Sequence, residues 1–165
     1  MARWLDPTFT APVRLQLGTG HHLRQIREAD VDLDYVAVMG SQERLWRIFG
    51  PAWGWPPVTM TKQADRGDLR RHAREMANNV SFNYAAFDPD ETALLGCVYI
   101  DPPERVGADA DISWWVVDEE VGEPLEDALT LEVPRWIEAA WPFEQPRFIG
   151  VDLTWQDWLA LPEDG

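Results

Sequence analysis

Three strand-like runs joined by tight turns, and the helix that follows them, constrain the fold of this chain more than any other feature. The runs cover residues 81–87, 92–100 and 109–117, and the turns between them are rich in Pro, Asp and Gly. Short apolar or alternating runs between such turns predict an antiparallel meander. A helical pattern begins at Pro124, just after Gly122. Free backbone N–H groups gather at the start of a helix, and they suit a phosphate or a pyrophosphate.

The flanking sequence predicts the remaining elements. Two short strands are expected at residues 13–17 and 23–27, and Asp30 or Asp32 can cap the helix that follows. A second helical piece covers about 45–49, a loop with three Pro and two Gly covers 50–57, and a helix covers about 61–79. The helix from Pro124 to Trp141 contains Pro134, which should kink or split it. A last strand is expected at 147–153, and a short amphipathic segment at 155–159.

This order predicts an α/β (α+β) domain, in which helices flank a mixed, mostly antiparallel central sheet. The chain has 165 residues, which fits one domain with a real core. We expect a single domain over residues 1–165, with its core at about 14–153, an irregular N-terminal arm and a short C-terminal tail. The 10 tryptophans should build core or interface, and some should line a concave surface or a homodimer contact.

The charge of the chain limits its partners. Its 29 acidic and 14 basic residues give a formal net charge of −15. Such a surface repels a phosphate backbone, which argues against nucleic-acid binding, and it favours cationic partners such as amines. A solvated acidic surface that aids solubility is the alternative explanation. No stretch is long and apolar enough to cross a membrane, and residues 1–7 lack the apolar core of a signal peptide, so a cytoplasmic protein is expected.

Neither the cysteine nor the histidines predict a metal site. The single cysteine, Cys97, lies in an apolar strand and is expected to be a buried small hydrophobe rather than a nucleophile. The three histidines, His21, His22 and His72, have no metal-ligand partners at a suitable spacing.

Three segments resemble the GNAT superfamily, the N-acetyltransferases that move an acetyl group from acetyl-CoA to an amine. Residues 23–30 (LRQIREAD) are similar to the family's entry strand, which ends in an acidic residue at the start of the first helix. Residues 95–100 (LGCVYI) resemble its third strand, with Gly before apolar residues, and residues 109–116 (DADISWWV) resemble its fourth. The resemblance covers about residues 14–153. It implies an acetyl-CoA-dependent N-acetyltransferase whose acceptor is a small-molecule amine or a peptide amine.

The resemblance also implies a place for acetyl-CoA. In the family the fourth strand splays from the fifth, and the pantetheine arm binds the exposed backbone, which corresponds here to Trp115, Val116 and Val117. The pyrophosphate binds backbone N–H groups in a Gln/Arg-x-x-Gly-x-Gly/Ala turn, which corresponds to residues 119–124 and includes Gly122 and Glu123.

This chain departs from the family pattern in two places. Of the turn motif only Gly122 is retained, because Glu119 replaces a polar or basic residue and Pro124 has no N–H group. Asp118, Glu119, Glu120 and Glu123 surround the expected phosphate position, where each like charge costs on the order of 1 kcal/mol. Only 12 residues follow Leu153 and none is Tyr, so no general acid can be carried over.

Two functions therefore stay open. Asp111 shares a strand face with Ser113 and Trp115 and is the candidate catalytic base for an N-acetyltransferase, although a structural role for it is the alternative. The second function is a GNAT-fold binding or interaction module that has lost acetyl-CoA binding, which the acidic turn favours.

Overall fold

The computed structural model describes residues 4–165, so the first three residues of the predicted N-terminal arm lie outside it. One sheet of six strands in the order β1-β2-β3-β4-β5-β6 forms the centre of the molecule. All neighbours pair antiparallel except β5 and β6, which are parallel. The strands are β1 (Arg14–Gln16), β2 (His22–Gln25), β3 (Phe82–Phe87), β4 (Leu94–Asp101), β5 (Ala110–Val116) and β6 (Pro146–Phe148). The predicted meander and the mixed, mostly antiparallel sheet are confirmed.

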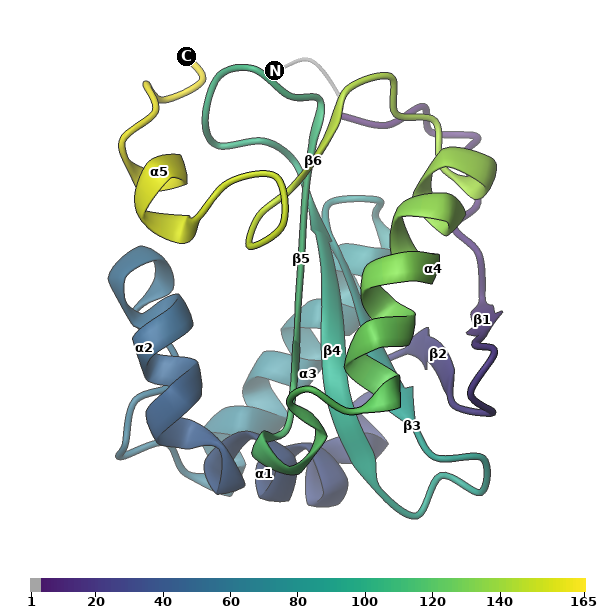
Figure 1. Cartoon of the computed structure of the whole chain (residues 1–165), viewed down its shortest axis with the longest axis vertical. Helices are drawn as coiled ribbons and strands as arrows, with labels where there is room; N and C mark the ends of the chain where they lie inside the picture. The colour runs from purple at the N-terminus through teal and green to yellow at the C-terminus, as the bar shows by residue number, and fades with distance from the viewer. Residues whose placement is uncertain (1–3) are drawn as a thin grey trace.

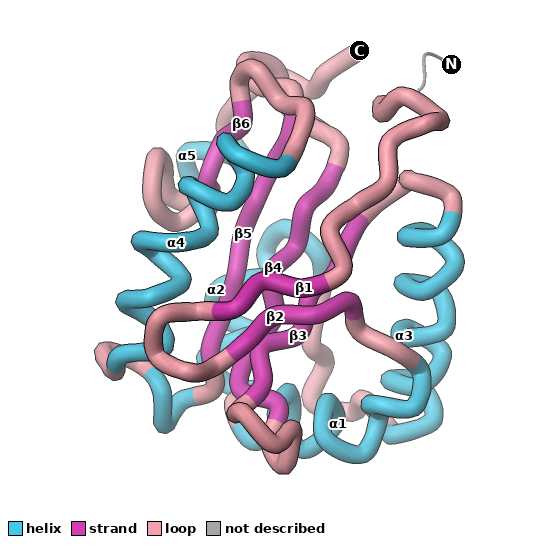
Figure 2. Tube along the Cα trace, turned by 90° about the vertical axis from the view of Figure 1, so that its right-hand side faces the viewer, coloured by secondary structure: helices cyan, strands magenta, loops and turns pink. Residues whose placement is uncertain are grey.

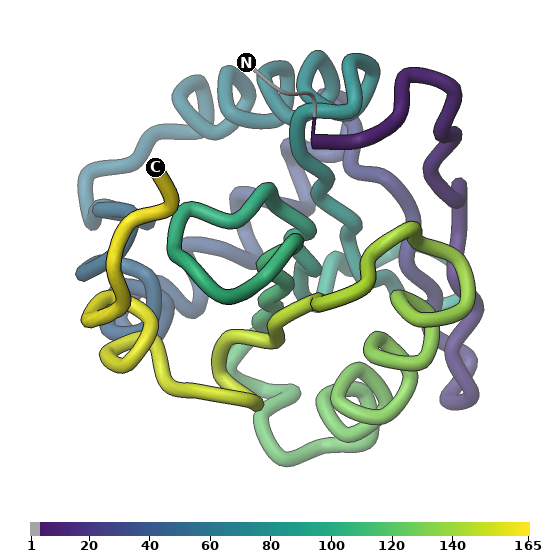
Figure 3. Tube along the Cα trace, turned by 90° about the horizontal axis from the view of Figure 1, so that it is seen from above, coloured from purple at the N-terminus to yellow at the C-terminus, as the bar shows by residue number. Residues whose placement is uncertain are grey.

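Helices cover both faces of this sheet (Figures 1 and 3). The helices α1 (Val31–Gly40) and α3 (Lys62–Ala77) contact β4 and β3 on one face. The helix α4 (Pro124–Ala140) packs on the other face and is held there by buried side chains along one side, among them Leu125, Leu129 and Val133. The helix α2 (Gln42–Trp53) lies beside α5 (Trp155–Leu159). Figure 2 shows β1 and β2 crossing the front of the molecule at the edge of the sheet.

A glycine allows β4 and β5 to approach closely. Gly96 pairs with Val116, and a Cβ atom on Gly96 would lie 2.2 Å from the carbonyl oxygen of Trp115. Such a contact is far inside van der Waals distance, and both atoms belong to rigid strand backbone, so only glycine fits this position.

Two expectations about element limits were wrong. The helix α2 continues through Gly50 and Pro51 and ends where Gly54 adopts a left-handed conformation (φ 61°), so the predicted loop begins four residues later. Pro134 does not split α4, which is continuous from Pro124 to Ala140, and a kink at Pro134 stays a prediction.

The last strand is also shorter than expected, since it ends at Phe148. The Asp152 side chain accepts the Phe148 N–H (3.0 Å), and the Asp152 N–H donates to the Phe148 carbonyl (2.8 Å), so the chain turns back at Gly150.

The short β6 leaves half of β5 without a strand neighbour on one side. Pairing between β5 and β6 ends at Ile112 and Phe148, followed by one bond from the Ile149 N–H to the Ile112 carbonyl (2.9 Å). From Ser113 to Val116 the edge of β5 faces the gap between the two strands.

Among residues 4–165, no helix is long and apolar enough to cross a membrane.

Candidate functional site

An arginine of α2 reaches the open edge of β5. The Val117 N–H donates to Leu95 in β4 (2.9 Å), so by the alternation of an antiparallel ladder the backbone groups of Trp114 and Val116 point into the gap. Arg44 donates to the Val116 carbonyl, and its Nε atom donates to Asp118 Oδ1 (2.6 Å). One of the polar groups predicted to bind pantetheine is therefore already bonded to a side chain of this protein.

The turn after β5, residues 117–127, is called the acidic turn below. Gly122 has a φ of +75°, and its N–H donates to the carboxylate Oε1 of Glu126 (3.0 Å). The Asp118 N–H donates to the Ser41 hydroxyl (2.8 Å), and the Glu123 N–H donates to the Glu120 carbonyl (3.1 Å). All three N–H groups are bonded within the chain, and two of them, those of Gly122 and Glu123, belong to the turn that the resemblance directs at a phosphate.

Charge in the acidic turn opposes an anion as well. It holds six carboxylates and no basic residue, and Arg44 supplies an ion pair to one of them, Asp118. The carboxylate of Glu126 lies on the Gly122 N–H, where a phosphate oxygen would bind. The residues of this turn therefore do not fit the pyrophosphate of acetyl-CoA in the position that the resemblance implies.

The five residues predicted to bind the cofactor lie close together in the chain, but their roles remain predictions. Trp115 is buried, and its indole N–H donates to the hydroxyl of Tyr99 (2.8 Å). Val116 and Val117 are buried at the end of β5, while Gly122 and Glu123 are exposed in the acidic turn. Their arrangement offers fewer free donors and acceptors than the resemblance implies.

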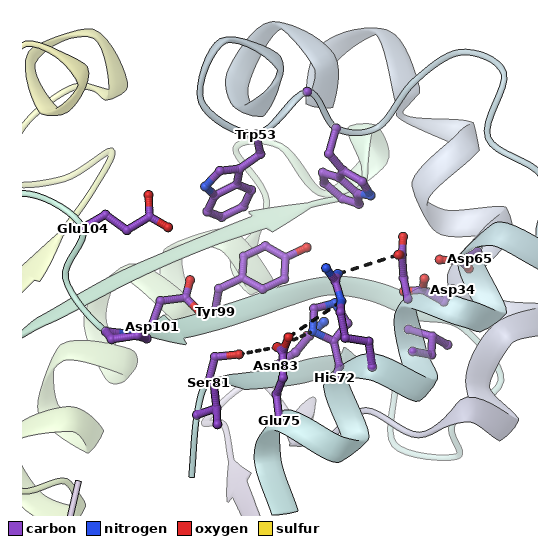
Figure 4. Close-up of a pocket in the computed structure, with 17 residues that line it drawn as sticks. Asp34, Trp53, Asp65, His72, Glu75, Ser81, Asn83, Tyr99, Asp101 and Glu104 are labelled. Atoms are coloured by element: carbon purple, nitrogen blue, oxygen red, sulfur yellow. Dashed lines mark hydrogen bonds and ion pairs between the residues drawn. The ribbon is translucent and has the colours of Figure 1, made fainter. Parts of the chain in front are cut away.

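A cavity of about 560 Å³ lies where the helices α1 and α3 face β3 and β4, and we call it the acidic cavity (Figure 4). Its walls come from α1, α3, β3, β4 and the segment after α2, and this volume is typical of a small-molecule site. Six carboxyl groups line it, against the two basic residues Arg71 and His72. The six are Asp34, Asp65, Asp68, Glu75, Asp101 and Glu104.

The environment of these carboxyls changes their protonation. Burial, and after it the neighbouring carboxyl of Asp65, raise the pKa of Asp34 well above its ordinary value. Burial also raises the pKa of Asp65. At Asp101, burial together with Glu104 and Glu75 raises the pKa to about 8. Burial and the neighbouring Arg71 lower the pKa of His72. Burial therefore favours the protonated form of Asp34, Asp65 and Asp101, and a bound cation would favour the charged form.

Aromatic rings form another part of the cavity wall. Tyr99 lies edge-on to Trp53 with ring centroids 5.4 Å apart, and Trp53 stacks on Phe49 at 5.0 Å. Trp55 packs against Trp115, with centroids 6.2 Å apart. Burial raises the pKa of the Tyr99 hydroxyl, so this group keeps its proton. The expectation that some tryptophans line a concave surface is confirmed for Trp53 and Trp55.

The predicted catalytic residue Asp111 lies outside this cavity. Its Oδ1 accepts from Arg147 Nε (2.7 Å) and its Oδ2 accepts from the Trp158 indole (3.1 Å). Asp111 is buried, and it pairs with Asp101 across the β4–β5 ladder. Its catalytic role remains a prediction, and these bonds match the structural role that was the alternative.

Sequence reasoning missed the acidic residues of the cavity, Asp101 included, although for two of them the sequence contains a signal. Asp65 stands four residues before Leu69, and Asp34 stands between Val31 and Val38, so each lies on the buried side of its helix. An acid on an apolar helix face is unusual enough to mark a site. In residues 4–165 no group of three or more His, Cys, Asp or Glu side chains is arranged to hold a metal ion.

Comparison with known proteins bears on the fold. No family model and no curated protein matches this chain. Among solved structures, ribosomal-protein-S5-alanine acetyltransferase from Vibrio fischeri matches with a TM-score of 0.57 and 16% identity, over 78% of this chain and 69% of the other. The ribosomal L7/L12 α-N-protein acetyltransferase RimL in complex with coenzyme A matches with a TM-score of 0.61 and 15% identity, over 74% and 67%. The microcin C7 self-immunity acetyltransferase MccE, in complex with acetyl-CoA and AMP, matches with a TM-score of 0.62 and 12% identity, over 78% and 66%. The chain has the fold of the GNAT acetyltransferases.

Proposed function

We propose that this protein is an N-acyltransferase that acts on a cationic amine bound in the acidic cavity. The observation that carries the proposal is the cavity, in which acidic side chains and aromatic rings surround a space of small-molecule size next to β4. Carboxylates and ring faces both attract an ammonium group. The fold supports the proposal, since similar structures are named as acetyltransferases, several of them for ribosomal proteins.

Asp101 is the proposed base. An ammonium group must lose a proton before its nitrogen can attack an acyl carbon, and a base with a pKa near the working pH transfers protons most effectively. The pKa of Asp101 is raised to about 8, and the carboxyl lines the cavity at the end of β4. The Tyr99 hydroxyl lines the same cavity and can donate a hydrogen bond there. The acceptor is a small amine or the N-terminal amine of a peptide.

The acyl donor is the part of the proposal that the acidic turn opposes. The acidic turn does not fit the pyrophosphate of acetyl-CoA, because the N–H groups of Gly122 and Glu123 are bonded within the chain and the charges of the turn repel phosphate. This observation favours a second candidate, an amine-binding module of the same fold without acyl transfer. Acetyl-CoA therefore enters the proposal as the donor to be tested. The predicted homodimer and cytoplasmic location stay predictions.

Release of free thiol from acetyl-CoA in the presence of amines separates the two candidates. We expect amine-dependent release that rises with pH up to about 8, the pKa of Asp101. Asp101→Asn should lose about 10²-fold or more of this activity, the usual contribution of a general base. The control Asp90→Asn removes the same charge from the exposed turn between β3 and β4, away from both the cavity and the acidic turn, and should leave the rate unchanged. Absence of thiol release, together with no calorimetric binding of acetyl-CoA at millimolar concentration, would overturn the acyltransferase and leave the binding module.

A further inference from the structure

The unpaired carboxyl groups of the acidic cavity form two separate clusters (Figure 4). Asp34 and Asp65, from α1 and α3, lie at one end of the cavity, and Asp101 and Glu104 lie at the other. In residues 4–165, none of these four has an ion-pair partner. The cavity therefore presents two regions of unpaired carboxyl groups rather than one.

The cavity contains buried groups with unused hydrogen-bonding capacity, both at the inner end and beside it on β3. Asp34 is 4% exposed, Asp65 is 2% exposed and Asn83 is 3% exposed. Asp65 Oδ2 and Asn83 Oδ1 are buried acceptors that bond to no donor within the described part of the chain. A buried acceptor without a donor is costly, typically by about 1–3 kcal/mol, and a fold that keeps two of them in one cavity points to a ligand that supplies donors.

The space between the two ends is aromatic. Trp53 and Tyr99 lie between the clusters in Figure 4, where an apolar chain can contact their rings. Arg71 also lines the cavity, but its charge is balanced by Asp68 (3.7 Å) and Glu75 (3.8 Å) on its own helix. The Glu75 carboxylate also accepts from the Ser81 hydroxyl (2.6 Å). Arg71 therefore does not neutralise either end.

We propose that the acidic cavity binds a linear molecule with an ammonium group at each end. One ammonium donates to Asp65 Oδ2 and Asn83 Oδ1 beside Asp34, and the other lies between Asp101 and Glu104. The methylene chain between them packs along Trp53 and Tyr99. This inference rests on the proposed function for the identity of the reacting end: the inner ammonium anchors the substrate, and the outer one is presented to Asp101.

The chemistry of the two ends favours a dication over other ligands. An ammonium group has three donors, which match the two orphan acceptors and a carboxylate oxygen of the buried pair. A monoamine would leave one cluster of carboxylates without a partner. An anionic ligand would meet four unpaired carboxylates. Carboxylates also bind divalent metal ions, so the binding of Mg²⁺ and Ca²⁺ is measured in the same calorimetric experiment.

Calorimetry with a series of α,ω-diaminoalkanes, from diaminopropane to diaminooctane, tests the inference without any acyl donor. We expect one chain length to bind best, about ten-fold or more tighter than the monoamine of that length, the effect of one added charge pair in a poorly solvated site. Equal affinities for diamine and monoamine, or tighter binding of Mg²⁺ or Ca²⁺ than of any diamine, would overturn it.

Charge-removing variants locate the two ends. Asp65→Asn should weaken the diamine about ten-fold and leave the monoamine almost unchanged, because the monoamine needs only the outer end. Glu104→Gln should weaken both. The matched control Asp127→Asn changes the net charge equally and should change neither affinity. Asp65→Asn keeps the shape of the side chain and removes a like charge from Asp34, so it should fold. Equal loss for both ligands with Asp65→Asn would contradict the inner anchor.

Proton release provides a readout that a merely structural role for Asp65 would not move. Burial raises the pKa of both Asp34 and Asp65, and Asp68 and Asp30 face Asp34 as well, so the pair holds a proton when no cation is bound. An incoming ammonium should displace it, and calorimetry in buffers of different ionisation enthalpy counts that proton. We expect release at neutral pH with the wild type and less with Asp65→Asn. Diamine binding without thiol release would remove the acyltransferase and keep this inference, whereas acetylation of monoamines alone would do the reverse.

Discussion

The acidic turn and the acidic cavity lie at opposite ends of the β4–β5 pair, and both are rich in carboxylates, yet their hydrogen bonds are in opposite states. In the turn the donors are in use, since the Gly122 N–H binds Glu126 and the Asp118 N–H binds Ser41. In the cavity the acceptors are unused, since Asp65 Oδ2 and Asn83 Oδ1 have no donor within residues 4–165. A count of charges would treat the two regions alike. Their hydrogen bonds separate a region that needs no ligand from one that accepts a cation.

This difference has a local cause in each region. The turn lies on the surface, where Glu126 in the first turn of α4 reaches back to Gly122 at little cost, as an acidic side chain does at any helix start. In the cavity, Asp34 and Asp65 lie on the buried faces of α1 and α3, and Asp65 Oδ2 has no donor within residues 4–165. Burial therefore converts an acidic group from a solvated charge into a binding group.

The largest expected effect tests the strand pair that the two regions share. Gly96→Ala places a Cβ atom 2.2 Å from the Trp115 carbonyl, so β4 and β5 must move apart. We expect the free energy of unfolding to fall by about 3 kcal/mol or more, measured by urea titration. We expect the substitution to disturb both regions. For the acidic cavity, the folded protein should bind diamines less tightly.

Gly67→Ala is the matched control for that substitution. Gly67 is in the interior of α3, and no atom lies within 4 Å of the position that a Cβ atom would take there. Alanine there should stabilise the protein by about 0.5–1 kcal/mol through its helix propensity. If Gly96→Ala were as well tolerated as Gly67→Ala, β4 and β5 would not approach as closely as described. The strand pair would then not link the two regions.

The second prediction concerns the arginine that bridges the gap beside β5. It tests whether this side chain holds the acidic turn in place. Arg44→Met keeps most of the side-chain bulk but removes the bonds to the Val116 carbonyl and to Asp118. We expect a loss of about 2 kcal/mol in the free energy of unfolding, because a part-buried carbonyl loses its donor. Arg47→Met, which removes an exposed pair with Glu43 in the same helix, should cost far less. Similar losses for the two variants would mean that Arg44 does not hold the turn.

The fold was predicted well where local patterns decide it. Alternation and turn residues located the meander at residues 81–117, and helical spacing located α3 and α4, because these signals need no knowledge of distant contacts. The errors occurred where tertiary contacts override local signals. Gly50 and Pro51 read as a loop, but packing of Phe49 and Trp53 keeps them in α2. The strand predicted at 147–153 stops at Phe148 because Asp152 bonds back to it.

The candidate site was predicted less well, for a physical reason. The sequence showed that the acidic turn departs from the family pattern, and the bonds to Glu126 and Ser41 strengthen that observation. It did not bring Asp34 and Asp65 together, because they belong to different helices and their contact depends on how α1 and α3 pack. Asp111 was chosen for its strand face. The structure adds its bonds to Arg147 and Trp158, which come from segments far away in the sequence.

The third prediction uses pH to test the burial of the cavity carboxyls. Asp101 has a pKa of about 8 in the folded state against an ordinary value of 3.8, so the folded protein binds more protons than the unfolded chain between these two pH values. Stability from this group therefore falls as pH rises from about 4 to about 8 and is constant above that. Asp101→Asn should abolish this loss and be more stable than the wild type by about 1–2 kcal/mol at pH 9, a value discounted because the residue is partly exposed. A difference between the two proteins that does not change with pH would show that Asp101 titrates normally.

The smallest expected effect tests whether the acidic turn is closed to anions by its own side chain. Glu126→Ala frees the Gly122 N–H and removes one negative charge, whereas Glu119→Gln removes one charge from the same turn and frees no N–H group. If the Glu126 carboxylate occupies the phosphate position, Glu126→Ala should tighten binding of coenzyme A about five- to ten-fold, equivalent to about 1 kcal/mol, and Glu119→Gln should do so by a smaller factor. Calorimetry at low ionic strength measures both, since salt screens exposed charges. Equal gains for the two variants would mean that charge alone keeps the phosphate out, and no gain in either would mean that coenzyme A binds elsewhere or not at all. In the last case the acidic turn is only a surface turn of this fold, and the acidic cavity alone carries the function.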